Sequence, residues 1–188
     1  MAEHKVILVL GAGRSSSSLI AHLLGQAEAE GWEIHVGDLD LSAAQSKVGD
    51  HPRGVAFALS GSDAADRNAR IERSDLVVSM LPAFMHVDVA KVAIAAGVNV
   101  ITPSYVSPEM KALDAEAQAA GVLVLNELGL DPGIDHLSAM QVIDDIRERG
   151  GRMVGFASYC GGLVAPASDD NPWHYKLSWN PRNVVLAG

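Results

Sequence analysis

The chain has 188 residues, of which 48% are hydrophobic and 20% are charged, a mix that argues against a disordered chain. Its 14 Lys and Arg against 23 Asp and Glu give a formal charge of −9, so a nucleic-acid partner is not expected. One Cys excludes an internal disulfide, and the first apolar run, residues 5–10, is too short to cross a membrane. We therefore expect a cytoplasmic protein with neither a nucleic-acid nor a membrane partner.

Short apolar segments alternate with helical stretches up to about residue 127. The first segment, Lys-Val-Ile-Leu-Val-Leu, is a continuous apolar run typical of a strand buried on both faces. Repeated strand–helix units with short connections predict right-handed crossovers and a parallel sheet. The predicted fold class is α/β, a Rossmann-type doubly wound parallel sheet. The expected strands are residues 5–10, 33–36, 54–59, 75–80, 98–101 and 122–125, and the expected helices are residues 15–30, 41–48, 64–73, 87–96 and 108–120.

The pattern changes after Glu127. Residues 129–133, Gly-Leu-Asp-Pro-Gly, predict a turn, and Asp135 stands where a helix cap is expected. Residues 136–149 predict a helix, and residues 175–179 are expected to form one more strand.

This change divides the chain into two expected domains, a nucleotide-binding domain over residues 1–127 and the start of an α/β substrate domain over residues 128–188. The second part is short and stops abruptly, so we expect it to be truncated. Exposed apolar surface and unpaired strand edges tend to find partners. We therefore expect the chain to be inactive by itself and to associate as a homodimer.

The strongest local motif is Gly-Ala-Gly-Arg-Ser-Ser, residues 11–16, between the first expected strand and the first expected helix. Gly11 permits the tight turn, and Gly13 lets the backbone approach a pyrophosphate. The helix N-terminus offers free N–H groups, so the amides of Ser15 and Ser16 are expected to bind the phosphates, and Arg14 could reach one. Ser16 replaces the usual third glycine with another small residue. The alternative is an ordinary glycine turn before a capped helix.

Asp38 ends the second expected strand, where a dinucleotide site carries an acid. A carboxylate there accepts hydrogen bonds from the ribose 2′-OH and repels a 2′-phosphate, so Asp38 favours NAD over NADP. Asp40 is a competitor two residues later, and a solvated loop acid is the alternative.

The loops after the fourth and fifth strands lie at the same carboxyl edge, where open parallel sheets bind ligands. We expect Leu81, Pro82 and Thr102 to line the cofactor cleft, and Ser104 and Tyr105 to face the substrate. A Tyr hydroxyl there could hydrogen-bond a substrate or relay a proton. Loop packing is the alternative interpretation.

Spacing alone leaves three later side chains open. Asp131 fits a simple turn residue, and His136, near a helix N-terminus, is expected to stay neutral. Cys160, which precedes Gly161, fits either a buried small hydrophobe or a thiol facing a cleft. The histidines have no ligand spacing, so no metal site is expected.

Four segments together carry a family resemblance: Ser-Met-Leu-Pro-Ala at residues 79–83, Thr-Pro-Ser-Tyr-Val-Ser-Pro-Glu-Met at 102–110, Asn-Glu-Leu-Gly-Leu-Asp-Pro-Gly-Ile-Asp-His at 126–136, and Ser-Tyr-Cys-Gly-Gly-Leu at 158–163. They resemble saccharopine dehydrogenase of the glutamate-forming type, also called saccharopine reductase, over nearly the whole chain. Enzymes of this family join the amino group of glutamate to aminoadipate semialdehyde and reduce the imine with a nicotinamide cofactor, in lysine metabolism.

The resemblance implies that Tyr105, Asp131 and Cys160 lie in the substrate cleft and are the catalytic candidates, with Ser104 and Gly161 beside them. It also implies NADP, bound through a basic residue after the second strand, whereas the residues of this chain favour NAD. The implied substrate is an amino acid. Family chains are much longer, which agrees with the expected truncation.

Two other functions fit the same features. One is a different reductive-condensing dehydrogenase of this architecture, of the carboxynorspermidine type. The other is a nucleotide-binding fragment that binds a cofactor without catalysis.

Overall fold

The computed structural model describes residues 4–59, 64–159 and 164–176. The chain divides into two compact units, Met1–Val142 and Ile143–Gly188. The boundary between the units therefore falls within the helix Ile134–Glu148, after the change in sequence pattern at residue 127. The domain boundary near residue 127 stays a prediction.

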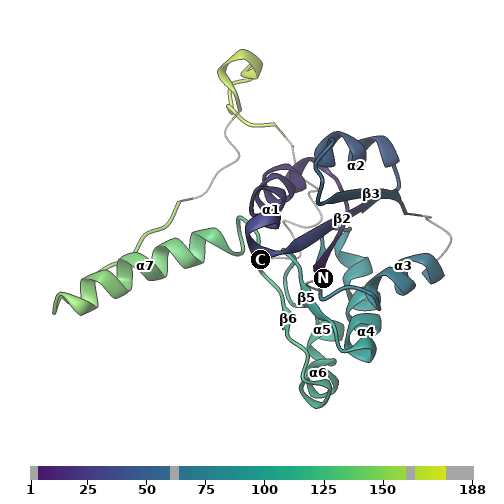
Figure 1. The fold of residues 1–188 in the computed structure, drawn as a ribbon. Coiled ribbons are helices and arrows are strands. Elements are labelled where there is room, and N and C mark those ends of the chain that lie inside the picture. The colour runs from purple at the N-terminus through teal and green to yellow at the C-terminus, as the bar shows by residue number, and fades with distance from the viewer. Residues whose placement is uncertain (1–3, 60–63, 160–163, 177–188) are drawn as a thin grey trace. The chain divides into compact units, whose positions relative to one another are not determined.

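The first unit contains a six-stranded sheet in which every neighbouring pair of strands is parallel (Figure 1). The strand order is β3-β2-β1-β4-β5-β6, so the order reverses between β1 and β4. This arrangement confirms the predicted Rossmann-type doubly wound sheet. The strands are β1 Lys5–Leu10, β2 Trp32–Asp38, β3 Gly54–Ala58, β4 Leu76–Ser79, β5 Asn99–Ile101 and β6 Val124–Leu125.

Helices connect the strands and cover both faces of the sheet (Figure 1). The α-helices are α1 Ser17–Glu30, α2 Leu41–Val48, α3 Ala64–Ile71, α4 His86–Ala96, α5 Pro108–Lys111, α6 Asp114–Ala120 and α7 Ile134–Glu148. Short 3-10 turns are η1 Arg14–Ser16, η2 Ala83–Met85 and η3 Pro166–Ser168. No helix among these described segments is both long and apolar enough to cross a membrane.

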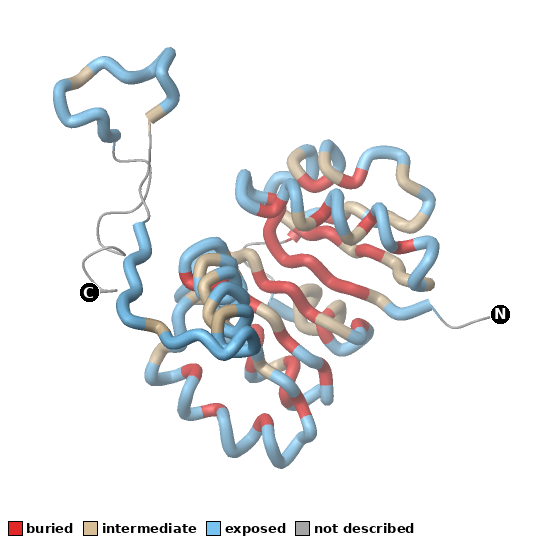
Figure 2. Tube along the Cα trace, turned by 90° about the vertical axis from the view of Figure 1, so that its left-hand side faces the viewer, coloured by how far each residue is buried: buried red, intermediate tan, exposed pale blue. Residues whose placement is uncertain are grey.

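The side chains of β1 alternate between the two faces of the sheet, and both faces are buried, which explains its continuous apolar sequence. Ile7 and Val9 pack in one core with α1 and α2, whereas Leu8 and Leu10 pack on the opposite face with α3 and α4. Figure 2 shows buried residues running along this central strand. Each such side chain contributes about 1.5–3 kcal/mol when it is removed from water. The two layers therefore fix β1 at the centre of the sheet.

One predicted helix is wrong in its continuity. Residues 108–120 form two helices, α5 and α6, because the chain makes a turn after Lys111. Met110, Leu113 and Ala117 nevertheless all pack in one cluster against α4. Their helical spacing continues across the turn, so the apolar pattern could not reveal the break.

The described part of the second unit contains the last residues of α7 and the short turn η3. Ion pairs join Arg147 to Asp144 and Arg149 to Asp145 along the helix, and every described residue of this unit is exposed or half-exposed. Of the strand expected at residues 175–179, the two described residues form no strand, and the others lie outside the described residues.

The residue that follows β1, Gly11, lies in close contact with the main chain at Met80. Gly11 has a φ of +106°, and a Cβ on it would lie 2.8 Å from the carbonyl oxygen of Met80, which follows β4. Both the backbone conformation and this contact require glycine.

We expect Gly11→Ala to lower the free energy of unfolding by about 1–3 kcal/mol, because it adds backbone strain and a clash with main-chain atoms. Chemical denaturation monitored by circular dichroism measures the change. Gly13→Ala is the matched control, since Gly13 has a φ of −65° and no atom within 4 Å of the added Cβ. Equal stability of the two variants would contradict this account.

Candidate functional site

The predicted glycine turn lies at the carboxyl edge of the sheet. The turn after β1 contains Gly11 and Gly13, and it lies beside Met80 where the strand order reverses. Gly13 has no heavy atom within 4 Å of a Cβ position, so its backbone is open to a ligand. Open α/β sheets bind ligands at such a reversal.

The free backbone N–H groups of this turn differ from the predicted pair, Ser15 and Ser16, because the Ser16 N–H is already used within the turn. The Ser16 N–H donates to the Gly13 carbonyl at 3.2 Å, and the buried Ser16 hydroxyl donates to the same carbonyl at 2.8 Å. Within the described part of the chain, the N–H groups of Gly13, Arg14 and Ser15 have no acceptor. The 3-10 turn η1 thus uses the Ser16 amide internally and leaves three consecutive N–H groups for an anion.

Asp38 is held directly against the glycine turn. Its Oδ2 accepts the Ala12 N–H at 2.6 Å, and its Oδ1 accepts the Asp40 N–H at 3.0 Å. A carboxylate offers about four lone-pair positions, so two remain for a ligand hydroxyl.

Asp40, the competing acid, caps helix α2. Its Oδ1 accepts hydrogen bonds from the Ser42 hydroxyl at 2.6 Å and from the Ser42 N–H at 2.9 Å. These hydrogen bonds lower the pKa of Asp40. Because Asp40 caps the helix, Asp38 is the better candidate for a ribose contact.

The loop after β4 begins with Leu81, which packs partly against the core, and with the exposed Pro82. The Pro82 carbonyl accepts the Met85 N–H at 2.9 Å, which starts η2. Pro82 is therefore the more accessible of these two predicted cleft residues.

Thr102 lies below the surface of the site. It is completely buried, its N–H donates to the Leu125 carbonyl, and its hydroxyl accepts the Ser104 N–H at 3.4 Å. Because Thr102 is completely buried, it is not accessible for the cofactor contact that the sequence predicted. Its contacts instead connect the ends of β5 and β6.

A buried histidine, His86 at the start of α4, links the end of β4 to the loop after β5, although the histidines have no ligand spacing in the sequence. His86 Nδ1 lies 2.8 Å from the Ser79 hydroxyl, and His86 Nε2 lies 2.9 Å from the Ser104 hydroxyl. Burial lowers the pKa of His86. The ring contacts one hydroxyl through each nitrogen. No motif spacing indicates this arrangement, because the contacts are tertiary.

The two described catalytic candidates, Tyr105 and Asp131, both reach the surface, and the Tyr105 side chain is 47% exposed. Glu127 supports the loop that carries Tyr105. Its N–H donates to the Ser104 carbonyl at 3.1 Å, and its Oε1 accepts the Val106 N–H at 3.2 Å. The loops after β5 and β6 are therefore joined beside these candidates.

Cys160 and Gly161, the remaining predicted substrate residues, lie outside the described residues. Arg14 and Ser15 are exposed on the turn, as a phosphate contact requires. Within residues 4–59, 64–159 and 164–176, no three His, Cys, Asp or Glu side chains group as ligands of a metal ion.

Two expectations about the start of α7 are wrong. Asp135 lies inside the first turn of the helix rather than at the cap, and its Oδ1 accepts the Gly133 N–H at 3.0 Å. The same oxygen accepts a hydrogen bond from His136 Nδ1 at 2.7 Å. This hydrogen bond, followed by Coulomb attraction to Asp135, raises the pKa of His136. The adjacent carboxylate outweighs the helix N-terminus, which the sequence argument had considered alone.

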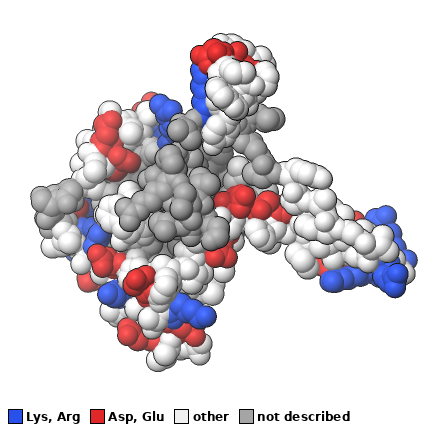
Figure 3. All heavy atoms as spheres, turned by 180° about the vertical axis from the view of Figure 1, so that it is seen from behind, with Lys and Arg blue, Asp and Glu red and all other residues white. Residues whose placement is uncertain are grey.

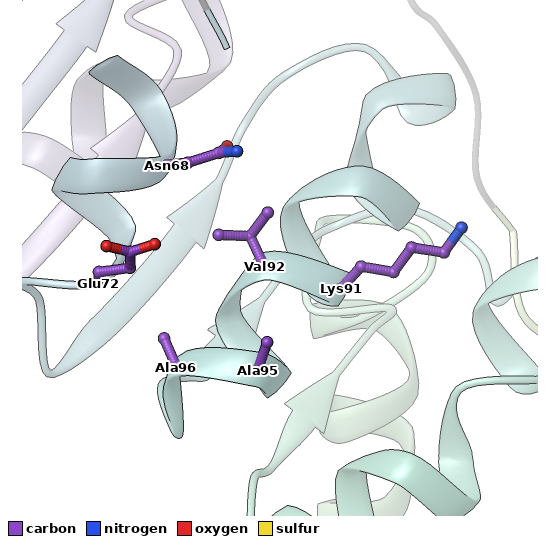
Figure 4. Close-up of a pocket in the computed structure, with 6 residues that line it drawn as sticks. All are labelled: Asn68, Glu72, Lys91, Val92, Ala95 and Ala96. Atoms are coloured by element: carbon purple, nitrogen blue, oxygen red, sulfur yellow. The ribbon is translucent and has the colours of Figure 1, made fainter. Parts of the chain in front are cut away.

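A separate groove lies between α3 and α4 (Figure 4). It is lined by Asn68, Glu72, Lys91, Val92, Ala95 and Ala96, near the C-terminal ends of both helices. Helices that follow parallel strands end at the amino edge of the sheet, so this groove is distant from the glycine turn.

Charged side chains of both signs are interspersed on the sheet-bearing part of the face in Figure 3. This face therefore shows no broad basic patch among the described residues.

The reversed parallel sheet, the glycine turn with free amides and the acid at the end of β2 define a nucleotide-binding domain of the Rossmann type. Residues 7–125 match the model of the saccharopine dehydrogenase NADP binding domain, and residues 129–188 match that of the saccharopine dehydrogenase C-terminal domain. The chain belongs to the saccharopine dehydrogenase family.

Curated relatives agree with this assignment. The chain is 40% identical over 183 residues to the NADP(+), L-glutamate-forming saccharopine dehydrogenase of Pyricularia oryzae, covering 97% of this chain and 40% of that protein. It is 38% identical over 186 residues to the mitochondrial alpha-aminoadipic semialdehyde synthase of Mus musculus, covering 99% of this chain and 20% of that protein.

A solved structure is also similar. Apo saccharopine dehydrogenase (L-Glu forming) from Saccharomyces cerevisiae has a TM-score of 0.79 and 38% identity, with 97% of this chain and 40% of that chain covered. The chain thus spans about two fifths of the length of these fungal relatives.

We expect His136 to titrate above its usual pKa of about 6.5 in an NMR titration, because Asp135 stabilises the imidazolium. The stabilisation is present at low pH and is lost as the pH rises through the raised pKa. Asp135→Asn should return the pKa toward its usual value. Asp114→Asn, which removes a carboxylate hydrogen-bonded to Gln118, should leave it raised. An unshifted pKa of His136 in the unchanged chain would contradict the hydrogen bond between His136 and Asp135.

Proposed function

We propose that this chain provides the nicotinamide-dinucleotide site and the start of the substrate domain of a saccharopine dehydrogenase. The reaction would transfer hydride between the cofactor and the carbon–nitrogen bond that joins glutamate to aminoadipate semialdehyde, in lysine metabolism. The observation that carries the proposal is the open row of N–H groups at Gly13, Arg14 and Ser15 beside the Asp38 carboxylate, in a chain of this family.

The residues of the turn fit a dinucleotide. A side chain at Gly13 would fill the space that the pyrophosphate needs, and the free N–H groups there suit its oxygens. Asp38 is fixed by the Ala12 N–H next to this position, which suits hydrogen bonds from the adenosine ribose. Arg14, exposed on the same turn, supplies a positive charge that a phosphate could approach.

The substrate step requires a protonated imine nitrogen so that the adjacent carbon accepts hydride. The nicotinamide, when bound, supplies or removes that hydride. Tyr105 and Asp131 are the proposed residues that orient the amino-acid substrate and relay the proton, and their exposure supports this role. Cys160 is proposed to line the same pocket.

Turnover of saccharopine, assayed separately with NAD and with NADP, tests the proposed activity. Consumption of saccharopine with reduction of either cofactor is the expected result. Binding of the cofactor without any turnover would favour a protein that binds nucleotide and has no saccharopine activity.

We expect Gly13→Val to abolish dinucleotide binding by the 188-residue chain, because the branched side chain blocks the backbone approach. Isothermal titration calorimetry with NADH and NADPH measures the loss. Gly25→Val is the matched control: Gly25 is exposed within α1 and also has no atom within 4 Å of its Cβ position. Unchanged affinity in Gly13→Val would refute the position of the site.

We further propose that the site prefers NAD to NADP by roughly tenfold to a hundredfold, because a 2′-phosphate near Asp38 costs desolvation and repulsion. Asp38→Asn keeps an acceptor for the Ala12 N–H but removes the charge, so it should narrow the preference. Asp50→Asn, an exposed acid beyond α2, is the control for net charge. Tighter NADP binding by the unchanged chain would overturn this preference.

A further inference from the structure

A half-buried lysine on α2, Lys47, contacts the glycine turn and the start of α1. The Lys47 ammonium donates to the Gly13 carbonyl oxygen, to the Ser17 hydroxyl at 3.0 Å and to the Ser16 hydroxyl at 3.2 Å. An ammonium has three donors, so these three acceptors use all of them.

We propose that Lys47 is a positioning residue, which holds the glycine turn in the shape that binds the phosphates of a dinucleotide; this inference rests on the proposed dinucleotide site. This inference adds a residue outside the turn, since Lys47 lies on α2, thirty-four positions after Gly13 in the sequence.

The hydroxyl groups of the turn are compatible with this role. The Ser16 hydroxyl donates to the Gly13 carbonyl at 2.8 Å, and the Ser17 hydroxyl donates to the Arg14 carbonyl at 3.3 Å. Each hydroxyl gives its single hydrogen to a turn carbonyl and accepts from Lys47 through a lone pair. The ammonium, both hydroxyls and two carbonyls therefore form one connected network.

This network fixes the orientation of the Gly13–Arg14 peptide, and with it the direction of the Arg14 N–H. The Gly13 carbonyl accepts from the Ser16 N–H, the Ser16 hydroxyl and Lys47, so it points into the protein. In a trans peptide the C=O and the following N–H point in opposite directions. The Arg14 N–H, which has no acceptor among the described residues, must then point away from Lys47.

A further anchor matters here because the other hydrogen bonds to the Gly13 carbonyl both come from Ser16, which belongs to the same turn. Glycine allows a wide range of backbone angles, and no neighbouring atom lies within 4 Å of the Gly13 Cβ position. A rotated peptide would present the Gly13 carbonyl oxygen, rather than an N–H, to a phosphate. Lys47 opposes that rotation.

The charge of Lys47 also suits an anionic ligand. None of the ion pairs among the described residues involves Lys47, so no carboxylate neutralises it. The ammonium lies at the N-terminal end of α1, where the helix dipole favours an anion and disfavours a cation. A bound pyrophosphate would relieve that repulsion.

Lys47→Met tests the inference, since it keeps an unbranched apolar side chain and removes the ammonium. Lys91→Met is the matched control, because Lys91 is exposed on α4 at the separate groove and the variant has the same net charge. Calorimetry with NADH, ADP-ribose and adenosine separates a phosphate effect from a general one. We expect Lys47→Met to weaken NADH and ADP-ribose about tenfold and adenosine less than about twofold.

A measurement without ligand examines the turn itself. The Ser16 amide donates to the Gly13 carbonyl, so its hydrogen exchange, followed by NMR, reports how firmly that carbonyl is held. We expect exchange of the Ser16 amide on the order of tenfold faster in Lys47→Met and unchanged in Lys91→Met.

The results distinguish this inference from the proposed function. If the unchanged chain binds NADH, equal affinity in Lys47→Met overturns the inference, and an equal loss for adenosine overturns it too because the effect is then not on the phosphates. If the unchanged chain binds no dinucleotide, the proposed function fails, and the exchange rate of the Ser16 amide alone decides whether Lys47 holds the turn.

Discussion

The close approach between the end of β1 and the end of β4 is the constraint on which the rest of the site depends. Gly11 lies so near the Met80 carbonyl that any side chain would collide with it, and its φ of +106° turns the chain away from the sheet. The turn that follows lies where the strand order reverses. Without this contact the free N–H groups after Gly11 would not lie at the carboxyl edge of the sheet, where the dinucleotide site is proposed.

Polar contacts then join the loops along that edge. Asp38 connects the end of β2 to the glycine turn through Ala12, and His86 connects the end of β4 to the loop after β5 through two hydroxyls. Glu127, in the loop after β6, accepts a hydrogen bond from the Val106 N–H in the loop after β5 and so joins these two loops. A hydrogen bond contributes only about 0.5–1.5 kcal/mol of net stability, so the chief effect of these contacts is to position the loops relative to one another.

An acidic chain can still bind an anionic ligand because the relevant field is local. The chain carries a net charge of −9, yet the turn presents unpaired N–H groups, the positive end of α1 and the ammonium of Lys47. Charges beyond about 10 Å are screened at moderate ionic strength, whereas groups that contact the ligand are not. The distribution of donors around the turn therefore matters more than the total charge.

The sequence by itself determined the strand and helix order, the parallel sheet and the glycine turn, because apolar periodicity and glycine spacing are local signals. Only the tertiary structure decided that Ser16 uses its amide internally, that Thr102 is buried, and that Lys47 and His86 take part in the site edge. The Ser16 contact is local but depends on the 3-10 conformation of the turn, whereas the other roles arise from contacts between residues on different elements. No local pattern records which side chains the packing of helices on a sheet will bring together.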